Sequence, residues 1–124
     1  MRLTRIDRWD PRLDGALSEA ALQQKLESLG YQPGARLYTA GAIVSPQADP
    51  RERIQAVARG LIKVTIDGES AILTAGDVVF VPCGAVRRIE VIGGAPAHCL
   101  EAASSDAASW PFFTSSSSRF ASAV

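Results

Sequence analysis

The hydrophobic pattern is clearest in residues 60–87, where short runs of alternating apolar and polar positions are separated by turn residues. In the run 62–66 every second residue is apolar and β-branched, which is typical of a strand with one buried face. Asp67 and Gly68 follow, and this pair favours a two-residue hairpin turn. Residues 69–74 are therefore predicted to return as a second strand paired with the first.

Two more strands are predicted directly after this hairpin. Residues 78–81 form a short apolar run that ends before Pro82, and alternation resumes in residues 86–92. If Ile89 and Val91 face the core, Arg87 has the same parity and points into the mouth of a barrel. Four short strands within forty residues predict a small all-β barrel or sandwich.

The rest of the central region continues the β pattern. Residues 35–44 predict two short strands broken by Gly41, and residues 97–102 predict the last strand. Residues 45–53 contain two prolines and several charges, so they are expected to form a loop or a strand edge. The run 54–59 is predicted as a strand in which three residues share one face: Ile54, Ala56 and Ala58.

The N-terminal segment predicts an extended arm followed by one helix. Ile6 and Trp9 are candidate anchors within the first dozen residues, although the sequence does not indicate what they pack against. Ser18 is a favourable N-cap for a helix through residue 29, and Gly30 can end it. Three leucines then fall on one helical face, which we expect to cover the barrel: Leu22, Leu26 and Leu29.

The C-terminal residues 104–124 are rich in Ser and Ala, a composition that favours disorder. Four aromatic residues interrupt this tail, and exposed aromatic side chains are unfavourable: Trp110, Phe112, Phe113 and Phe120. Docking onto the barrel or a second subunit, and disorder, both stay open. The predicted organisation is an arm and helix in 1–34, a barrel in 35–103 and this tail.

Composition narrows the class of protein. The chain has 124 residues, and its 13 basic and 13 acidic residues cancel, so a nucleic acid or an anionic membrane surface is not expected as a partner. No apolar run reaches membrane-spanning length and no signal-peptide pattern opens the chain, so a cytoplasmic location is expected. Cys83 and Cys99 are too few for a disulfide framework and are expected to be buried, reduced thiols.

The spacing of glycine and proline in the barrel region resembles two motifs of the cupin family. Gly76, Pro82 and Gly84 match the second motif, whose histidine position holds Arg87 here. The first motif fits the frame 41–60 without insertion. This resemblance covers residues 37–102 and implies a small jelly-roll β-barrel that pairs into a homodimer.

In metal-binding cupins the two motifs supply three histidines and a glutamate. The corresponding positions here hold Gln47, Asp49, Arg53 and Arg87. A guanidinium stays protonated and has no lone pair to offer, and two of them repel a cation. No metal and no other cofactor is therefore expected. His98 lies outside both motifs and is expected to be structural, since a catalytic metal usually has three protein ligands.

Two interpretations of the substituted positions stay open. In the first, Arg53 and Arg87 converge on a small carboxylate or phosphate, with Gln47 adding a hydrogen bond. In the second, Asp49 pairs with one or both arginines and no ligand binds. Cys83, next to the predicted mouth, is included in the candidate pocket because a nearby arginine can lower a thiol pKa.

Two classes of function follow. The first is a metal-free binding or interaction protein, and the second is an enzyme similar to the isomerases or dioxygenases of the cupin family. The second would use Asp49 and a nearby arginine for acid-base chemistry, or a divalent ion held by Asp49 and His98. The substitutions favour the first class.

Overall fold

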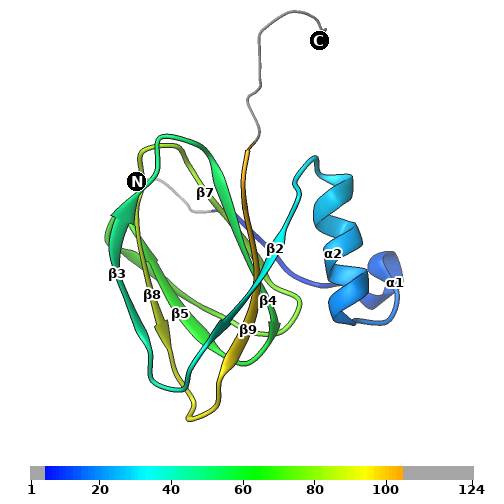
Figure 1. The fold of residues 1–124 in the computed structure, drawn as a ribbon. Coiled ribbons are helices and arrows are strands. Elements are labelled where there is room, and N and C mark those ends of the chain that lie inside the picture. Colours follow the sequence, from blue (N-terminus) through cyan, green and yellow to red (C-terminus); the bar gives the residue numbers. More distant parts are fainter. Residues whose placement is uncertain (1–4, 105–124) are drawn as a thin grey trace, which may run out of the picture.

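The computed structural model describes residues 5–104 as two antiparallel sheets that face each other (Figure 1). The order of strands is β1-β7-β4-β9-β2 in one sheet and β3-β8-β5-β6 in the other. The strands are β1 (Ile6–Asp7), β2 (Gly34–Tyr38), β3 (Ile43–Ala48), β4 (Arg53–Arg59), β5 (Ile62–Ile66), β6 (Glu69–Leu73), β7 (Val78–Val81), β8 (Val86–Val91) and β9 (Ala97–Ala103). This arrangement confirms the predicted all-β jelly roll.

The predicted central hairpin is present. β5 and β6 pair in register from Ile62 opposite Leu73 to Ile66 opposite Glu69. The turn between them has positive φ at both of its residues, 48° at Asp67 and 87° at Gly68. Such a turn has the twist that joins two strands directly, which explains why Asp-Gly predicts it.

The main core fills the space between the two sheets. It is built from inward-facing β-branched residues and a few smaller side chains, including Val57, Ile62, Val64, Ile89 and Cys99. The alternation predicted for β8 is confirmed, because Ile89 and Val91 are buried and Arg87 shares their face. The inward face of β8 therefore carries apolar residues deep in the barrel and an arginine nearer its end.

A second apolar cluster lies on the outer face of the five-stranded sheet. The helix α2 (Glu19–Ser28) places Leu22 and Leu26 there, each 0% exposed, against Ile54, Leu100 and their neighbours. The backbone N–H of Ala21 donates to Ser18 Oγ, which confirms the predicted cap. Leu29, in contrast, is 42% exposed, so the buried helical face is narrower than predicted.

The N-terminal arm joins the same sheet. β1 pairs with β7, Ile6 packs against the main core and Trp9 against the second cluster, so both predicted anchors are confirmed. The extended arm expected over the first dozen residues ends slightly earlier, because α1 (Pro11–Asp14) begins at residue 11. Asp10 caps this short helix by accepting from the backbone N–H of Arg12, and proline is favourable at its first position.

One further expectation is met and another lies outside the described range. The segment 45–53, expected as a loop or strand edge, contains the end of β3, which among the described residues is an edge strand paired only with β8 and ends at Ala48. The aromatic tail, with Trp110, Phe112, Phe113 and Phe120, falls outside the described residues. No helix within residues 5–104 is long and apolar enough to cross a membrane.

The contact of Trp9 with Gly76 yields a test of the arm. Gly76 and Gly84 both have positive φ, 91° and 78°, but an added Cβ would lie 2.6 Å from Trp9 Cβ at Gly76 and would meet nothing within 4 Å at Gly84. We expect Gly84→Ala to cost about 1–2 kcal/mol through backbone strain alone. Gly76→Ala should cost about 1–3 kcal/mol more, because it also displaces the indole. Urea unfolding measures both.

The double variant Trp9→Gly/Gly76→Ala serves as the control, since removal of Trp9 Cβ together with the indole should abolish the extra cost of the alanine at position 76. Equal destabilisation by the two single glycine substitutions would show that the arm does not pack as described.

Candidate functional site

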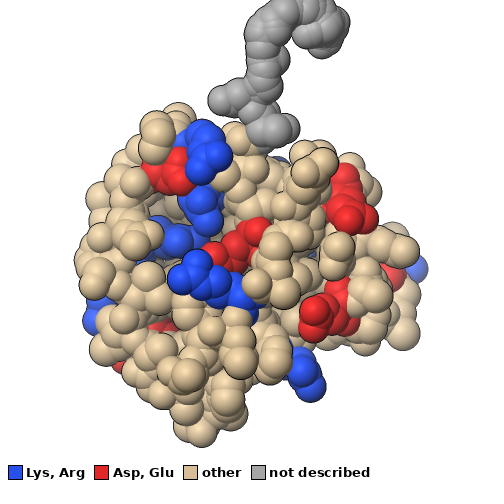
Figure 2. Space-filling model, viewed as in Figure 1, with Lys and Arg blue, Asp and Glu red and all other residues tan. Residues whose placement is uncertain are grey.

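A cavity of about 250 Å³ opens at one end of the barrel (Figure 2). This end collects the start of β4 and β8 and the end of β3 and β7. Basic atoms gather inside and around the hollow. Its lining residues are Arg36, Gln47, Ala48, Asp49, Arg53, Val81, Ala85 and Arg87.

Strand pairing places two of the predicted residues side by side. Arg87 on β8 lies opposite Gln47 on β3, and residues opposite each other in antiparallel strands share a face of the sheet. Between Val44 and Gln47, β3 has one residue more than the paired part of β8. This bulge lets Gln47 and Arg87 both face the interior. The bulge therefore brings Gln47 into the cavity.

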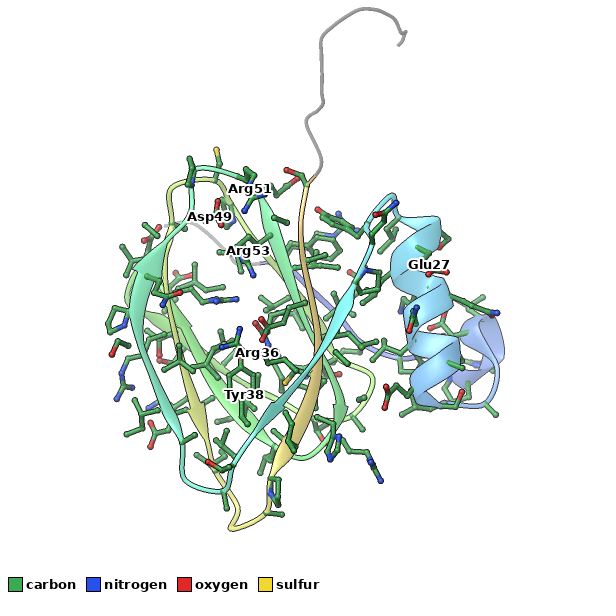
Figure 3. All side chains as sticks on the ribbon, viewed as in Figure 1. Glu27, Arg36, Tyr38, Asp49, Arg51 and Arg53 are labelled. Carbon is green, nitrogen blue, oxygen red and sulfur yellow. The ribbon has the colours of Figure 1, made fainter. Side chains whose placement is uncertain are left out.

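The other basic side chains come from the facing sheet. Arg53 begins β4, and Arg36 lies on β2 at the edge of that sheet. Figure 3 shows Arg36, Tyr38 and Arg53 directed into the barrel, with Asp49 and Arg51 at the loop above them. The predicted convergence of Arg53 and Arg87 on one cavity is therefore observed, and Arg36 is added to it.

A buried hydrogen-bond relay lies beneath the cavity. Arg87 Nη1 donates to Gln55 Oε1 at 2.8 Å, and Gln55 Nε2 donates to Glu101 Oε2 at 2.8 Å. The hydroxyl of Tyr38 donates to the same Glu101 oxygen. Burial, together with this bond to Glu101, raises the pKa of Tyr38 far above its ordinary range. The phenol therefore stays a donor, and Glu101 is satisfied inside the barrel.

Arg53 joins the relay to the loop above it. Its Nη1 donates to Asp49 Oδ2 at 3.1 Å, and its Nη2 lies 3.9 Å from Glu101 Oε1. Its Nε is buried and has no hydrogen-bond partner among the described residues. An unpaired donor of a charged group is costly to bury, so this nitrogen lowers the stability of the fold.

Asp49 is held mainly by its own loop. Its carboxylate accepts from the backbone N–H of Arg51 at 2.8 Å and from the side chains of Arg51 and Arg53. These hydrogen bonds, with the backbone bond the largest, lower the pKa of Asp49 to about 2. Asp49 therefore pairs with Arg53, as one interpretation predicted, but its recorded ion pairs do not include Arg87.

A sequence comparison identifies the family. The family model described as a cupin domain matches residues 36–103, more than half of the chain. This chain belongs to the cupin family. No curated protein matches it.

Solved structures agree with the cupin assignment at the level of the fold. The cupin domain of Schizosaccharomyces pombe Cnp3 is 21% identical, with a TM-score of 0.58 over 61% of this chain and 56% of that chain. A cupin protein from Bacteroides fragilis is 24% identical, with a TM-score of 0.56 over 67% and 72% of the two chains. A salicylate 1,2-dioxygenase from Pseudaminobacter salicylatoxidans is 16% identical, with a TM-score of 0.54 over 59% and 20%.

The side chains of this cupin do not fit the divalent ion that many cupins carry. Its four ligand positions hold Gln47, Asp49, Arg53 and Arg87, and Asp49 already accepts from two arginines. Guanidiniums repel a cation and cannot coordinate one. No group of three or more His, Cys, Asp or Glu within residues 5–104 is arranged to hold a metal.

His98 and Cys83 lie away from this chemistry. His98 is on β9 with Leu37 and Arg59 as pairing partners, next in sequence to Cys99, which faces the core. It therefore points out of the barrel, so the alternative metal pair of Asp49 and His98 is wrong. Cys83 is exposed and is not among the cavity-lining residues, so its expected burial was also wrong. Its turn, beside Gly84, lies open to solvent.

The cavity and the relay beneath it also use four residues that the sequence did not single out: Arg36, Tyr38, Gln55 and Glu101. Gln55 and Glu101 are polar residues within strands that otherwise read as apolar, and both are at most 9% exposed. A polar residue at an inward position of a predicted strand is the signal that identifies such a relay. Arg36 carries no comparable signal, because the parity of β2 depends on its pairing with β9.

The relay predicts that the side-chain amide of Gln55 contributes strongly to the stability of the fold. Gln55→Leu keeps the side-chain volume but leaves the Arg87 donor and the Glu101 acceptor without their shared partner. We expect a loss of about 3 kcal/mol in the free energy of unfolding, because buried charged groups lose hydrogen bonds. Gln47→Leu, at an exposed position of the same cavity, should change it by less than about 0.5 kcal/mol. Equal stabilities would contradict the relay.

The two thiols should differ in reactivity. Cys99 is 1% exposed, and burial raises its pKa to about 12, whereas Cys83 is exposed. Because the thiolate is the reactive form, an aromatic disulfide reagent at pH 8 should modify one thiol per folded chain and two in denaturant. Cys83→Ser should abolish the reaction of the folded chain. Rapid modification of two thiols before unfolding would show that Cys99 is accessible.

Proposed function

We propose that this cupin binds a small carboxylate or phosphate anion in the barrel cavity, without a metal ion. The observation that carries the proposal is the cavity lining, which contains three guanidiniums and a single carboxylate, Asp49. That carboxylate is already engaged by Arg51 and Arg53. Guanidiniums in a concave site are suited to carboxylates and phosphates, which accept two parallel N–H bonds from one fork.

Catalysis by Asp49 has less support. A general base works best when its pKa is close to the working pH, and hydrogen bonds hold the pKa of Asp49 at about 2. The same carboxylate is occupied as an acceptor by Arg51 and Arg53. These contacts favour a binding protein over the isomerase-like or dioxygenase-like alternative. The homodimer and the cytoplasmic location stay predictions.

The proposal predicts a thermal shift with a defined arginine dependence. The purified protein is heated with acetate, propionate, succinate, glutarate or phosphate at constant ionic strength. An anion present at about 100 times its Kd adds about 2.7 kcal/mol of stability, which raises the Tm of a chain of this size by about 10 °C. Arg87→Gln should abolish the shift, because it removes a guanidinium from the cavity wall.

Arg88→Gln is the matched control for this experiment. Arg88 is the next residue on β8, faces the outside and pairs with Glu90 at 3.5 Å, so its loss should leave the anion shift unchanged. No shift with any anion would overturn the proposal and leave a self-satisfied ion-pair network. Stoichiometric iron, manganese, nickel or zinc in the purified protein would overturn its metal-free part.

A further inference from the structure

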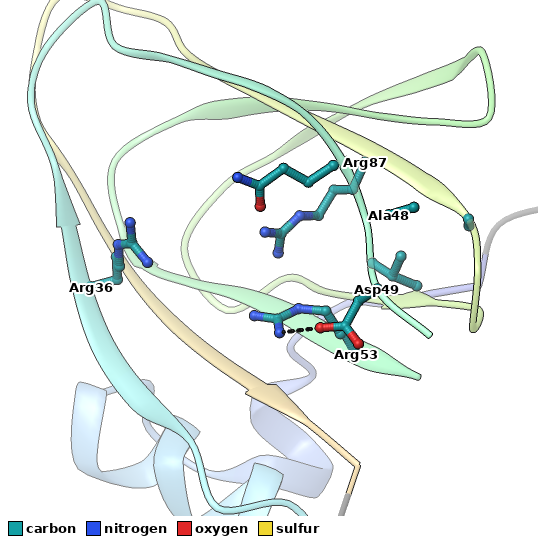
Figure 4. A pocket seen from close by; sticks show the side chains of 8 residues that line it. Arg36, Ala48, Asp49, Arg53 and Arg87 are labelled. Carbon is teal, nitrogen blue, oxygen red and sulfur yellow. Dashed lines mark hydrogen bonds and ion pairs between the residues drawn. The ribbon is translucent and has the colours of Figure 1, made fainter. Parts of the chain in front are cut away.

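The cavity presents guanidiniums from both of its walls. Arg36 belongs to β2 in the five-stranded sheet, and Arg87 belongs to β8 in the four-stranded sheet. Figure 4 shows Arg36 on one side of the opening and Arg87 with Arg53 on the other. A ligand with acceptor groups at two ends would contact both sheets.

The charges around the cavity leave these two arginines unneutralised. Arg53 has Asp49 at 3.1 Å and Glu101 at 3.9 Å, and Asp49 also pairs with Arg51. Within residues 5–104, no ion pair is recorded for Arg36 or Arg87. The four guanidiniums exceed the two carboxylates by two positive charges, which a dianion would balance.

The same buried relay orients the guanidiniums of Arg36 and Arg87. The guanidinium carbon of Arg36 lies 5.5 Å from the ring centre of Tyr38, a cation–π contact. Arg87 donates to Gln55, and Tyr38 and Gln55 both donate to Glu101. Glu101 orients both Tyr38 and Gln55. The guanidiniums of Arg36 and Arg87 are therefore partly ordered before a ligand arrives, which lowers the entropic cost of binding.

The size and shape of the site favour a short two-ended ligand. A volume of about 250 Å³ equals that of about eight water molecules, so the cavity has room for a ligand of roughly eight non-hydrogen atoms. A planar carboxylate matches one guanidinium fork. Phosphate concentrates its charge on one centre, whereas a dicarboxylate carries one matching group at each end.

From these observations we infer that the anion is a small dicarboxylate whose two ends are bound by Arg36 and Arg87. This inference rests on the proposed function and specifies its ligand class.

Calorimetric titration with succinate and propionate tests the inference, because they differ mainly in the second carboxylate. A second charge-assisted bidentate contact should make succinate bind roughly ten to a hundred times more tightly than propionate. Arg36→Gln should reduce succinate affinity toward that of propionate, and should reduce propionate affinity much less than succinate affinity. Arg36 is exposed, so this variant should fold, and circular dichroism checks it.

The control and the contrary outcomes separate this inference from the proposed function. Arg88→Gln should keep the preference for succinate. Equal affinity for succinate and propionate, tighter binding of phosphate, or full succinate affinity in Arg36→Gln would overturn the dicarboxylate inference while anion binding stands. No binding of succinate, propionate or phosphate would overturn both.

Discussion

A carboxylate buried inside the barrel is the constraint on which the site depends. Glu101 is 9% exposed, and an ion in that position is stable only when donors surround it. Tyr38 on β2 and Gln55 on β4 donate to it, and Arg53 on β4 lies 3.9 Å away as an ion-pair partner. Each of these side chains is thereby held in one orientation, and the atoms that it presents to the cavity are fixed as well. The shape of the opening follows from satisfying this one charge.

The same geometry underlies the proposed replacement of a metal ion by an anion in this cupin barrel. The positions that hold a cation in metal-binding cupins still converge here, because strand register and the bulge before Gln47 set their direction. Two of these positions hold arginines that line the cavity, Arg53 and Arg87, so the electrostatic field there repels a cation. In the proposed function, the frame that holds a positive ion in metal-binding cupins receives a negative one here, with Asp49 as an internal counterion for Arg53.

Packing outside the barrel stabilises the strand that carries much of this site. β4 is buried on both faces, with Gln55 and Val57 toward the barrel and Ile54 and Ala56 toward α2. A strand covered on both sides does not show a simple polar and apolar alternation. The helix and the N-terminal arm thus hold the Arg53 and Gln55 backbone in place, although neither element reaches the cavity lining.

Local patterns alone determined the strands, the Asp67-Gly68 hairpin, the cap at Ser18 and the inward parity of Arg87, because each depends on neighbours within a few residues. They also carried the cupin motifs, and with them four cavity residues. Only the tertiary structure decided the partners of those residues. Glu101 meets Gln55 across 46 positions of sequence, and strand pairing, not spacing, sets such contacts. The exposure of Cys83, the outward direction of His98 and the place of Arg36 were decided in the same way.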